Sequence, residues 1–307
     1  MTADPGLHRA PLGYGEDGPL TWVAECRVPW EPPSPERLAM AEWMIRNGSD
    51  VHQGQDGPLM REALNGDRVA MMELLVAHGA DVNELWHGGY PILFAACEGL
   101  NPKGLRWLLE HGAEPNRTDG YSVLDYLIEG YSRDAARFRA CLEILLEHGA
   151  RTKYDEPAVL ALLRGRLDEL ASLLDADPGL VEKRFPDLTC GQTGGRLLLL
   201  NGATLLHVAA EYQDIDAARL LLARGADVNA GCSAHGQTAI FHAATQFDEE
   251  GLDIVRLLID HGADLSIAAR LPGDYETPGD VVEGTVREYA ARFGAGEATL
   301  AALEKRK

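Results

Sequence analysis

Residues 202–230 read GATLLHVAAEYQDIDAARLLLARGADVNA, and they contain two apolar helical patterns separated by a short polar stretch. The first pattern includes the paired alanines Ala209 and Ala210, whose small side chains allow neighbouring helices to approach closely. The second pattern ends at Gly225, and glycine is the residue that most easily adopts the left-handed conformation after a helix. The stretch therefore predicts a pair of short helices that is followed by a tight turn.

The helix-ending phrase of this stretch recurs along the chain. Related phrases are HGADVN at 78–83, HGAEPN at 111–116, HGART at 148–152, HGADLS at 261–266 and a weaker NGSDV at 47–51. Their glycines, with Gly225, stand at positions 48, 79, 112, 149, 225 and 262, in steps of 31, 33, 37, 76 and 37. Because 76 is about twice the other steps, we expect one repeat inside it to have lost its marker. A helix pair that cannot bury its own apolar face is stabilised by stacking on its neighbours.

A second phrase precedes each helix ending by roughly 20 residues. Its copies are DGPLTWVAE at 17–25, DGPLMREAL at 56–64, GGYPILFAACEG at 88–99, DGYSVLDYL at 119–127, GATLLHVAAEY at 202–212 and GQTAIFHAA at 236–244. Together the two phrases resemble the ankyrin repeat, whose signature is T-P-L-H-x-A-A…G…LL…G-A-D-x-N with a period near 33. The resemblance covers about residues 17–290. It implies an all-α fold, an α-solenoid in which helix-turn-helix units stack and are joined by short β-hairpin loops.

The spacing divides the chain into a tail over 1–16, a single solenoid over 17–303 and a second tail over 304–307. The expected repeats span about 17–51, 56–84, 88–117, 119–152, 157–185 (degenerate), 202–230, 236–266 and a closing half-unit at 277–303. An insertion at 186–201 lies between two of them, and loops of this length in a compact array are often functional. We interpret it as a structural hairpin with 197–200 as an extended strand, or alternatively as a binding loop.

The composition limits the classes of partner. The chain carries 48 Asp+Glu against 28 Lys+Arg, a net charge of −20, so we expect no nucleic-acid partner. A partner protein with a basic surface would be favoured, although the acidity also keeps an exposed solenoid soluble. The N-terminal residues lack the pattern of a signal peptide, and the longest apolar run, 197–200, is too short for a membrane span. The five cysteines include no C-x-x-C pair, so we expect a reducing, cytoplasmic location and no metal or cofactor.

Histidines precede several of the helix-ending glycines, which raises the question of a metal site. These residues are His78, His111, His148 and His261. Stacked helices lie about 10 Å apart, whereas zinc requires nitrogen ligands at roughly 2 Å, so equivalent histidines cannot share one ion. We interpret them as side chains that satisfy the last carbonyl groups of each helix. The family resemblance implies a structural role for His207 as well, through hydrogen bonds that hold the turn together. No residue is expected to be catalytic.

The resemblance also implies a binding surface, formed by the hairpin tips and the exposed face of the first helices, which together line a concave groove. Position by position, the candidate partner-binding residues are Trp86, His87, Cys97, Glu98, Tyr121, Ala203, Glu211, Tyr212, His235, Gln237, Thr245 and Gln246. Trp86, Tyr121 and Tyr212 are expected to be exposed aromatic residues, a type that is enriched in binding hot spots, or else to pack against neighbouring hairpins. Trp22, Trp30, Trp43 and Trp107 are expected in the core or in a cap.

Two functional hypotheses follow. The first is a non-catalytic protein-protein interaction module or scaffold that binds a partner protein in the groove. The alternative is a small-molecule sensor or enzyme with its site at the 186–201 insertion, where the polar residues are Thr189, Cys190, Gln192, Thr193 and Arg196. A convergent polar cluster at the insertion would favour the alternative. The sequence leaves the oligomeric state open.

Overall fold

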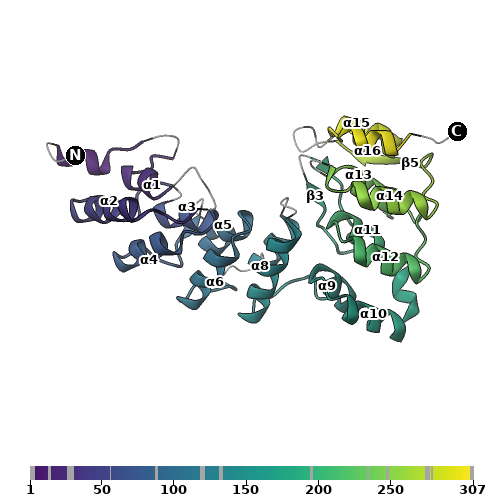
Figure 1. The fold of residues 1–307 in the computed structure, drawn as a ribbon, viewed down its shortest axis with the longest axis horizontal. Helices are drawn as coiled ribbons and strands as arrows, with labels where there is room; N and C mark the ends of the chain where they lie inside the picture. The colour runs from purple at the N-terminus through teal and green to yellow at the C-terminus, as the bar shows by residue number, and fades with distance from the viewer. Residues whose placement is uncertain are drawn as a thin grey trace. The chain divides into compact units, whose positions relative to one another are not determined.

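The structure is a computed structural model that describes residues 4–12, 15–25, 31–55, 57–86, 89–117, 122–130, 134–193, 196–233, 235–246, 249–273, 277 and 279–304. Its contacts divide the chain into two compact units (Figure 1). Unit 1 consists of residues 1–127 and 136–152, and unit 2 consists of residues 128–135 and 153–307. Both units are built from short helices in pairs, so the predicted all-α ankyrin-type fold is confirmed.

In unit 1, like helices of successive repeats contact one another. The first helices are α1 (Pro19–Ala24), α3 (Gly57–Leu64) and α5 (Ile92–Glu98), and the second helices are α2 (Pro35–Arg46), α4 (Val69–Ala77) and α6 (Pro102–Glu110). A 3₁₀ helix, η1 (Pro5–Arg9), precedes them, and the strands β1 (Leu85–Trp86) and β2 (Tyr90–Pro91) form a hairpin before α5. Helices α7 (Val123–Glu129) and α8 (Ala135–Glu147) contribute most of their residues to this unit.

Unit 2 repeats the same arrangement. Its first helices are α9 (Pro157–Leu163), α11 (Leu205–Glu211), α13 (Ala239–Ala244) and α15 (Val286–Arg292), and its second helices are α10 (Leu167–Ala176), α12 (Ile215–Ala223), α14 (Leu252–Asp260) and α16 (Glu297–Ala302). A 3₁₀ helix, η2 (Pro178–Val181), follows α10. Two antiparallel hairpins join β3 (Gln192–Thr193) to β4 (Arg196–Leu197) and β5 (Ala268–Pro272) to β6 (Val281–Thr285). The segment expected as a closing half-unit thus forms two helices.

The core lies between the stacked first helices. The leucine and isoleucine stripe that the repeat predicts is at most 1% exposed at Leu20, Leu59, Ile92, Leu124, Leu206 and Ile240. Complete burial of one such side chain contributes roughly 1.5–3 kcal/mol. The alanine pairs Ala95–Ala96 and Ala209–Ala210 are fully buried as well, which agrees with their predicted role in close helix packing.

The helix-ending phrase has one geometry throughout. The glycines 79, 112, 149, 225 and 262 have φ values between 76° and 102°, the left-handed region that an L side chain rarely adopts. At the first of these turns, the N–H of Gly79 donates to the Val76 carbonyl and the N–H of Ala80 to the Leu75 carbonyl, which is the Schellman ending of a helix. The sequence prediction for these glycines is therefore confirmed.

The polar residues of the phrase close the turn and link repeats. The Asp227 carboxylate accepts from the Asn229 N–H at 2.9 Å, and the Asn229 amide donates to the Gly262 carbonyl of the next repeat at 3.1 Å. Asn229 also accepts from the Asp264 N–H at 2.8 Å. Asn83 and Asn116 make the same pair of bonds to their own following repeats. No helix in the described part of the chain is long and apolar enough to cross a membrane.

Candidate partner-binding surface

The β1–β2 hairpin presents apolar side chains to solvent. Its register pairs Leu85 with Pro91 and Trp86 with Tyr90, and the Ile92 N–H closes it by donating to the Glu84 carbonyl at 3.0 Å. Leu85 is 43% exposed and Tyr90 is 45% exposed, so both can be reached by another molecule. A two-residue strand on each side leaves this hairpin dependent on the helices behind it.

An aromatic row supports the hairpin from those helices. The Tyr90 ring lies 5.1 Å from the buried Phe94 ring of α5, which lies 4.7 Å from the Tyr126 ring of α7. The Tyr126 hydroxyl donates to the Glu98 carboxylate at 2.8 Å, and both residues are half-buried. We call Leu85, Tyr90, Glu98 and Tyr126 the β1–α5 surface; it lies entirely within unit 1.

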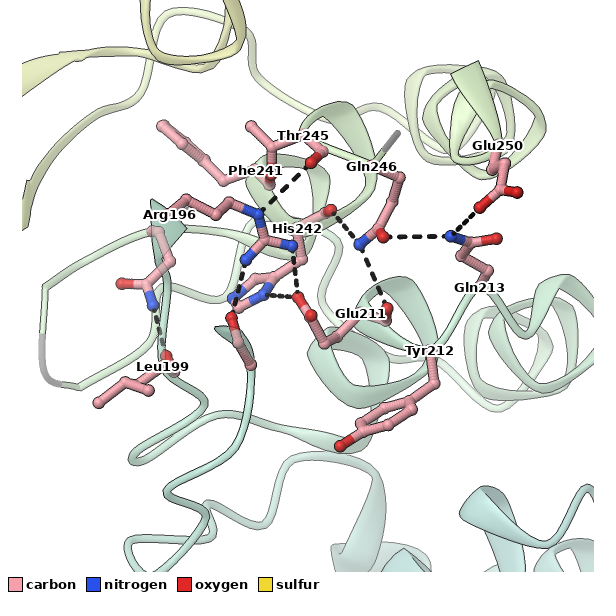
Figure 2. A network of polar contacts seen from close by, with 12 residues as sticks. Arg196, Leu199, Glu211, Tyr212, Gln213, Phe241, His242, Thr245, Gln246 and Glu250 are labelled. Atoms are coloured by element: carbon pink, nitrogen blue, oxygen red, sulfur yellow. Dashed lines mark hydrogen bonds and ion pairs between the residues drawn. The ribbon is translucent and has the colours of Figure 1, made fainter. Parts of the chain in front are cut away.

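In unit 2 the equivalent region contains a buried charge cluster (Figure 2). The Glu211 carboxylate accepts from the Arg196 guanidinium at 2.8 Å and from His242 Nδ1 at 2.8 Å. All three side chains are at most 1% exposed. Arg196 comes from the insertion, whereas Glu211 and His242 come from α11 and α13, so the Glu211 carboxylate joins the insertion to both repeats.

Backbone carbonyl groups and amide side chains complete the cluster. Arg196 also donates to the Gly191 carbonyl at 2.9 Å and the Thr245 carbonyl at 3.5 Å. The Gln246 amide donates to the carbonyls of Glu211 and His242, at 3.2 and 2.9 Å. The network continues from Gln246 through Gln213 to the exposed Glu250 (Figure 2).

The histidines near this cluster serve the structure. His207 accepts at Nδ1 from the N–H of Thr204, at 3.3 Å, and its Nε2 lies 3.1 Å from the Gln237 carbonyl, so its predicted role in the turn is confirmed. Burial, with the neighbouring His242, lowers the pKa of His207 to about 3 and keeps it neutral. At the helix ends, Nδ1 of each of three histidines lies 2.7–2.8 Å from the carbonyl four residues earlier, as predicted: His111, His148 and His261.

The structure separates the predicted partner-binding residues into three groups. Glu98 and His235 are half-buried. His87, Tyr121 and the side chain of Trp86 lie outside the described residues. The residues at most 8% exposed are Cys97, Ala203, Glu211, Tyr212, Gln237, Thr245 and Gln246. The exposure expected for six of these side chains is therefore wrong, and Tyr212, for which exposure and packing were both open, is packed.

The physical reason in unit 2 is bonding to parts of the chain that are distant in sequence. The Tyr212 hydroxyl donates to the Ile128 carbonyl at 2.6 Å, and the Gln237 amide donates to the Leu199 carbonyl of the insertion at 3.1 Å. Thr245 and Gln246 belong to the cluster around Arg196 (Figure 2). A side chain that is bonded and buried in this way presents no surface to a partner.

The insertion is a structural hairpin in the part that is described. Leu198 and Leu200 are fully buried, Cys190 is 2% exposed, and the Leu200 N–H donates to the Cys190 carbonyl at 2.9 Å. Thr189 accepts from Lys153 Nζ at 2.9 Å. The side chains of Gln192 and Thr193 lie outside the described residues. A convergent polar cluster does form around Arg196, but it is occupied by the protein's own groups.

Sequence reasoning overlooked much of the exposed apolar surface. Tyr90 stands where other repeats have the threonine before the first helix, as at Thr204, and this replacement by a large aromatic residue was the available clue. Of the tryptophans expected in the core or a cap, Trp107 is 7% exposed, but Trp22 and Trp43 are 45% and 40% exposed, and Trp30 lies outside the described residues.

Comparison with known protein families agrees with this architecture. The family model for ankyrin repeats (3 copies) matches residues 35–119 and 134–269, and the chain belongs to the ankyrin-repeat family. Among solved structures, the chain is similar to the human ASB11 ankyrin repeat domain, with 25% sequence identity, a TM-score of 0.38, and coverage of 82% of this chain and 99% of that chain. Ankyrin repeats are generally protein-protein interaction modules, and the family is typically non-enzymatic.

Proposed function

We propose that this chain is a non-catalytic interaction module that binds a partner protein through the β1–α5 surface of unit 1. The observation that carries the proposal is the exposure of Leu85 and Tyr90, at 43% and 45%, on a hairpin backed by an aromatic row. Aromatic residues beside a rigid support lose little conformational freedom on binding and are enriched in hot spots. The sequence candidates Trp86, His87 and Tyr121 remain part of the proposal as neighbours of this surface in the chain.

We place the partner-binding surface in unit 1 and not in unit 2 because the residues at corresponding positions of the repeats differ in burial. Cys97 and Glu98 follow the alanine pair of α5, and the equivalent residues after the alanine pairs of α11 and α13 are Glu211–Tyr212 and Thr245–Gln246. The four residues in unit 2 are at most 8% exposed, whereas Glu98 is half-buried and holds a carboxylate near the surface. That carboxylate and the net charge of −20 favour a partner whose contact surface contains Lys or Arg.

The test compares affinity purifications with three baits from a lysate of the source organism: wild type, Leu85→Ala/Tyr90→Ala and Val281→Ala. Val281 is an exposed apolar residue of a different hairpin, at 55%, and serves as the matched control. We expect a protein that is retained by wild type and Val281→Ala and lost by the double variant, with unchanged circular dichroism. If all three baits retain the same proteins, the β1–α5 surface is not the binding site. If wild type retains no protein, the proposal is contradicted.

A further inference from the structure

The first helix pair exposes an apolar face that the described residues cover only in part, through the His8 ring that lies 5.3 Å from the Trp43 ring. Met40 and Trp43 of α2 are 55% and 40% exposed, and Trp22 of α1 is 45% exposed. Between these helices lies a shallow hollow of about 500 Å³, lined by Val23, Met40 and Trp43 among others. Contiguous apolar surface of this kind on a folded protein marks a binding site more often than chance. The hollow lies within unit 1 and does not include the β1–α5 surface.

The sequence of α2 explains why this face exists. Glu36, Ala39, Met40 and Trp43 are spaced as i, i+3, i+4 and i+7, so they form one stripe along the helix. The other sides of α1 and α2 are used, because α1 packs on α3 and α2 packs on α4 (Figure 1). The stripe is thus a second apolar face, beyond the one that stacking requires.

The last helix pair of the chain provides an internal comparison. A helix pair at the end of a repeat stack needs a polar outer face to remain soluble. The exposed residues of α15 and α16 meet this requirement, since they include Arg287, Glu288, Arg292 and Glu297. The described residues of α15 and α16 include no exposed large apolar side chain. Exposed large apolar side chains are thus present on α1 and α2 and absent from the described residues of α15 and α16.

The described residues that line the hollow include one charged residue, which is acidic. Glu36 is the charged residue among those that line it, and it forms no ion pair with any described residue. Hydrogen bonds from its own backbone N–H and from Ser34 lower the pKa of Glu36, so it is ionised at neutral pH. Of the arginines of α2, Arg37 donates to the Val23 and Glu25 carbonyls at 3.0 Å, and Arg46 pairs with Glu42 at 2.5 Å.

We propose that the α1–α2 face binds an amphipathic helix of a partner protein, with an apolar stripe against Met40 and Trp43 and Lys or Arg beside Glu36. A groove between two helices accepts a third helix through anchors at i, i+3, i+4 and i+7. A second copy of this chain is disfavoured, because the contact would oppose two surfaces of net charge −20.

The probe is a synthetic peptide of about 18 residues, above the ~12–15 that an isolated helix needs, with Leu at helical spacing and flanking Lys. Two controls share its length: a scrambled peptide of the same composition, and a counterpart with Glu in place of Lys. Binding of each labelled peptide is measured by fluorescence anisotropy. The protein variants are Met40→Glu, Glu36→Lys and Val281→Glu, the last adding the same charge at an exposed apolar site of unit 2.

Wild type should bind the Lys peptide about tenfold more tightly than the scrambled peptide. Met40→Glu should lose about tenfold in affinity, Val281→Glu should lose less than about twofold, and Glu36→Lys should prefer the Glu peptide. Equal binding of the scrambled peptide, equal effects of Met40→Glu and Val281→Glu, or no binding at all would each overturn the proposal. A dimer in sedimentation equilibrium that Met40→Glu abolishes would also overturn it, by assigning the face to a second copy.

The Leu85→Ala/Tyr90→Ala variant separates this inference from the proposed function. It should bind the Lys peptide as wild type does, because neither residue lines the hollow. Loss of peptide binding in this variant would place the peptide on the β1–α5 surface and would contradict the inference. A negative result for peptide binding at the α1–α2 face would therefore not decide the proposed function, which the affinity purification tests separately.

Discussion

At the scale of single residues, the asparagine of the helix-ending phrase has the same bonding role in each of three repeats. Asn229 donates to the Gly262 carbonyl and accepts from the Asp264 N–H, so one side chain satisfies two backbone groups of the next repeat. Asn83 and Asn116 do the same. Each bond is worth roughly 0.5–1.5 kcal/mol, and the pair fixes where the following turn begins. A side chain that lacks either the amide donor or the carbonyl acceptor cannot provide both.

Glu84 provides a prediction at this scale. Burial, together with the charge of Asp81, raises the pKa of Glu84 to about 7 from 4.5, and the carboxyl is 16% exposed. Because the folded-state pKa is the higher one, the stability that Glu84 provides is complete below about pH 4.5 and is lost as the pH rises through 7. We expect Glu84→Gln, which cannot ionise, to stabilise the protein at pH 8 by at most roughly 3 kcal/mol and to have little effect at pH 4.5.

Urea unfolding of wild type and Glu84→Gln at both pH values measures this difference. Glu36→Gln is the control, because the pKa of Glu36 is lowered and its charge is favoured in the folded state. A stabilisation of Glu84→Gln that is the same at both pH values would contradict the assignment.

At the scale of elements, the sequence predicted what depends on local pattern. Helix stripes, alanine pairs and glycine endings come from residues within one repeat, and the structure has them where they were expected. The burial of Tyr212 could not be predicted in the same way, because its hydroxyl bonds to the Ile128 carbonyl, 84 residues away in sequence. Trp43 shows the converse: its stripe has the pattern of a core face, but the ring of His8, 5.3 Å away, covers it only in part and leaves it 40% exposed.

The insertion hairpin leads to the second prediction. Arg196 and Glu211 are at most 1% exposed, so removal of one partner leaves the other charge buried without compensation. We expect Arg196→Met and Glu211→Gln each to destabilise the protein by about 3–5 kcal/mol, measured by urea denaturation. The double variant should recover much of this loss, since it contains neither charge.

An exposed pair gives the control for this cycle. Arg256 lies 3.5 Å from Asp253 on α14, with both side chains more than half exposed. Arg256→Met should change stability by less than about 1 kcal/mol. Additive losses in the Arg196/Glu211 double variant would show that the two side chains are not energetically coupled.

At the scale of the whole molecule, we expect the net charge of −20 to affect the association rate with a partner more than the dissociation rate of the complex. If the partner surface is basic, the association rate should fall roughly tenfold as ionic strength rises from about 0.02 to 0.5 M, because the Debye length shortens. Stopped-flow mixing with the protein recovered by wild type provides the measurement. We expect the dissociation rate to stay unchanged over this range. A constant association rate would show that the net charge does not steer the partner.

The bond pattern of the insertion has a consequence for rearranging the repeats. In unit 1, helix pairs are joined to their neighbours by stacking and by asparagine bonds, so a pair could be removed or duplicated with both new junctions of the same type. In unit 2, Arg196 ties α11 and α13 to residues that precede both of them. To graft either repeat into another array, the segment 186–246 would have to be transferred as one block. Without Arg196, the carboxylate of Glu211 would be buried at its new site with no arginine to pair with.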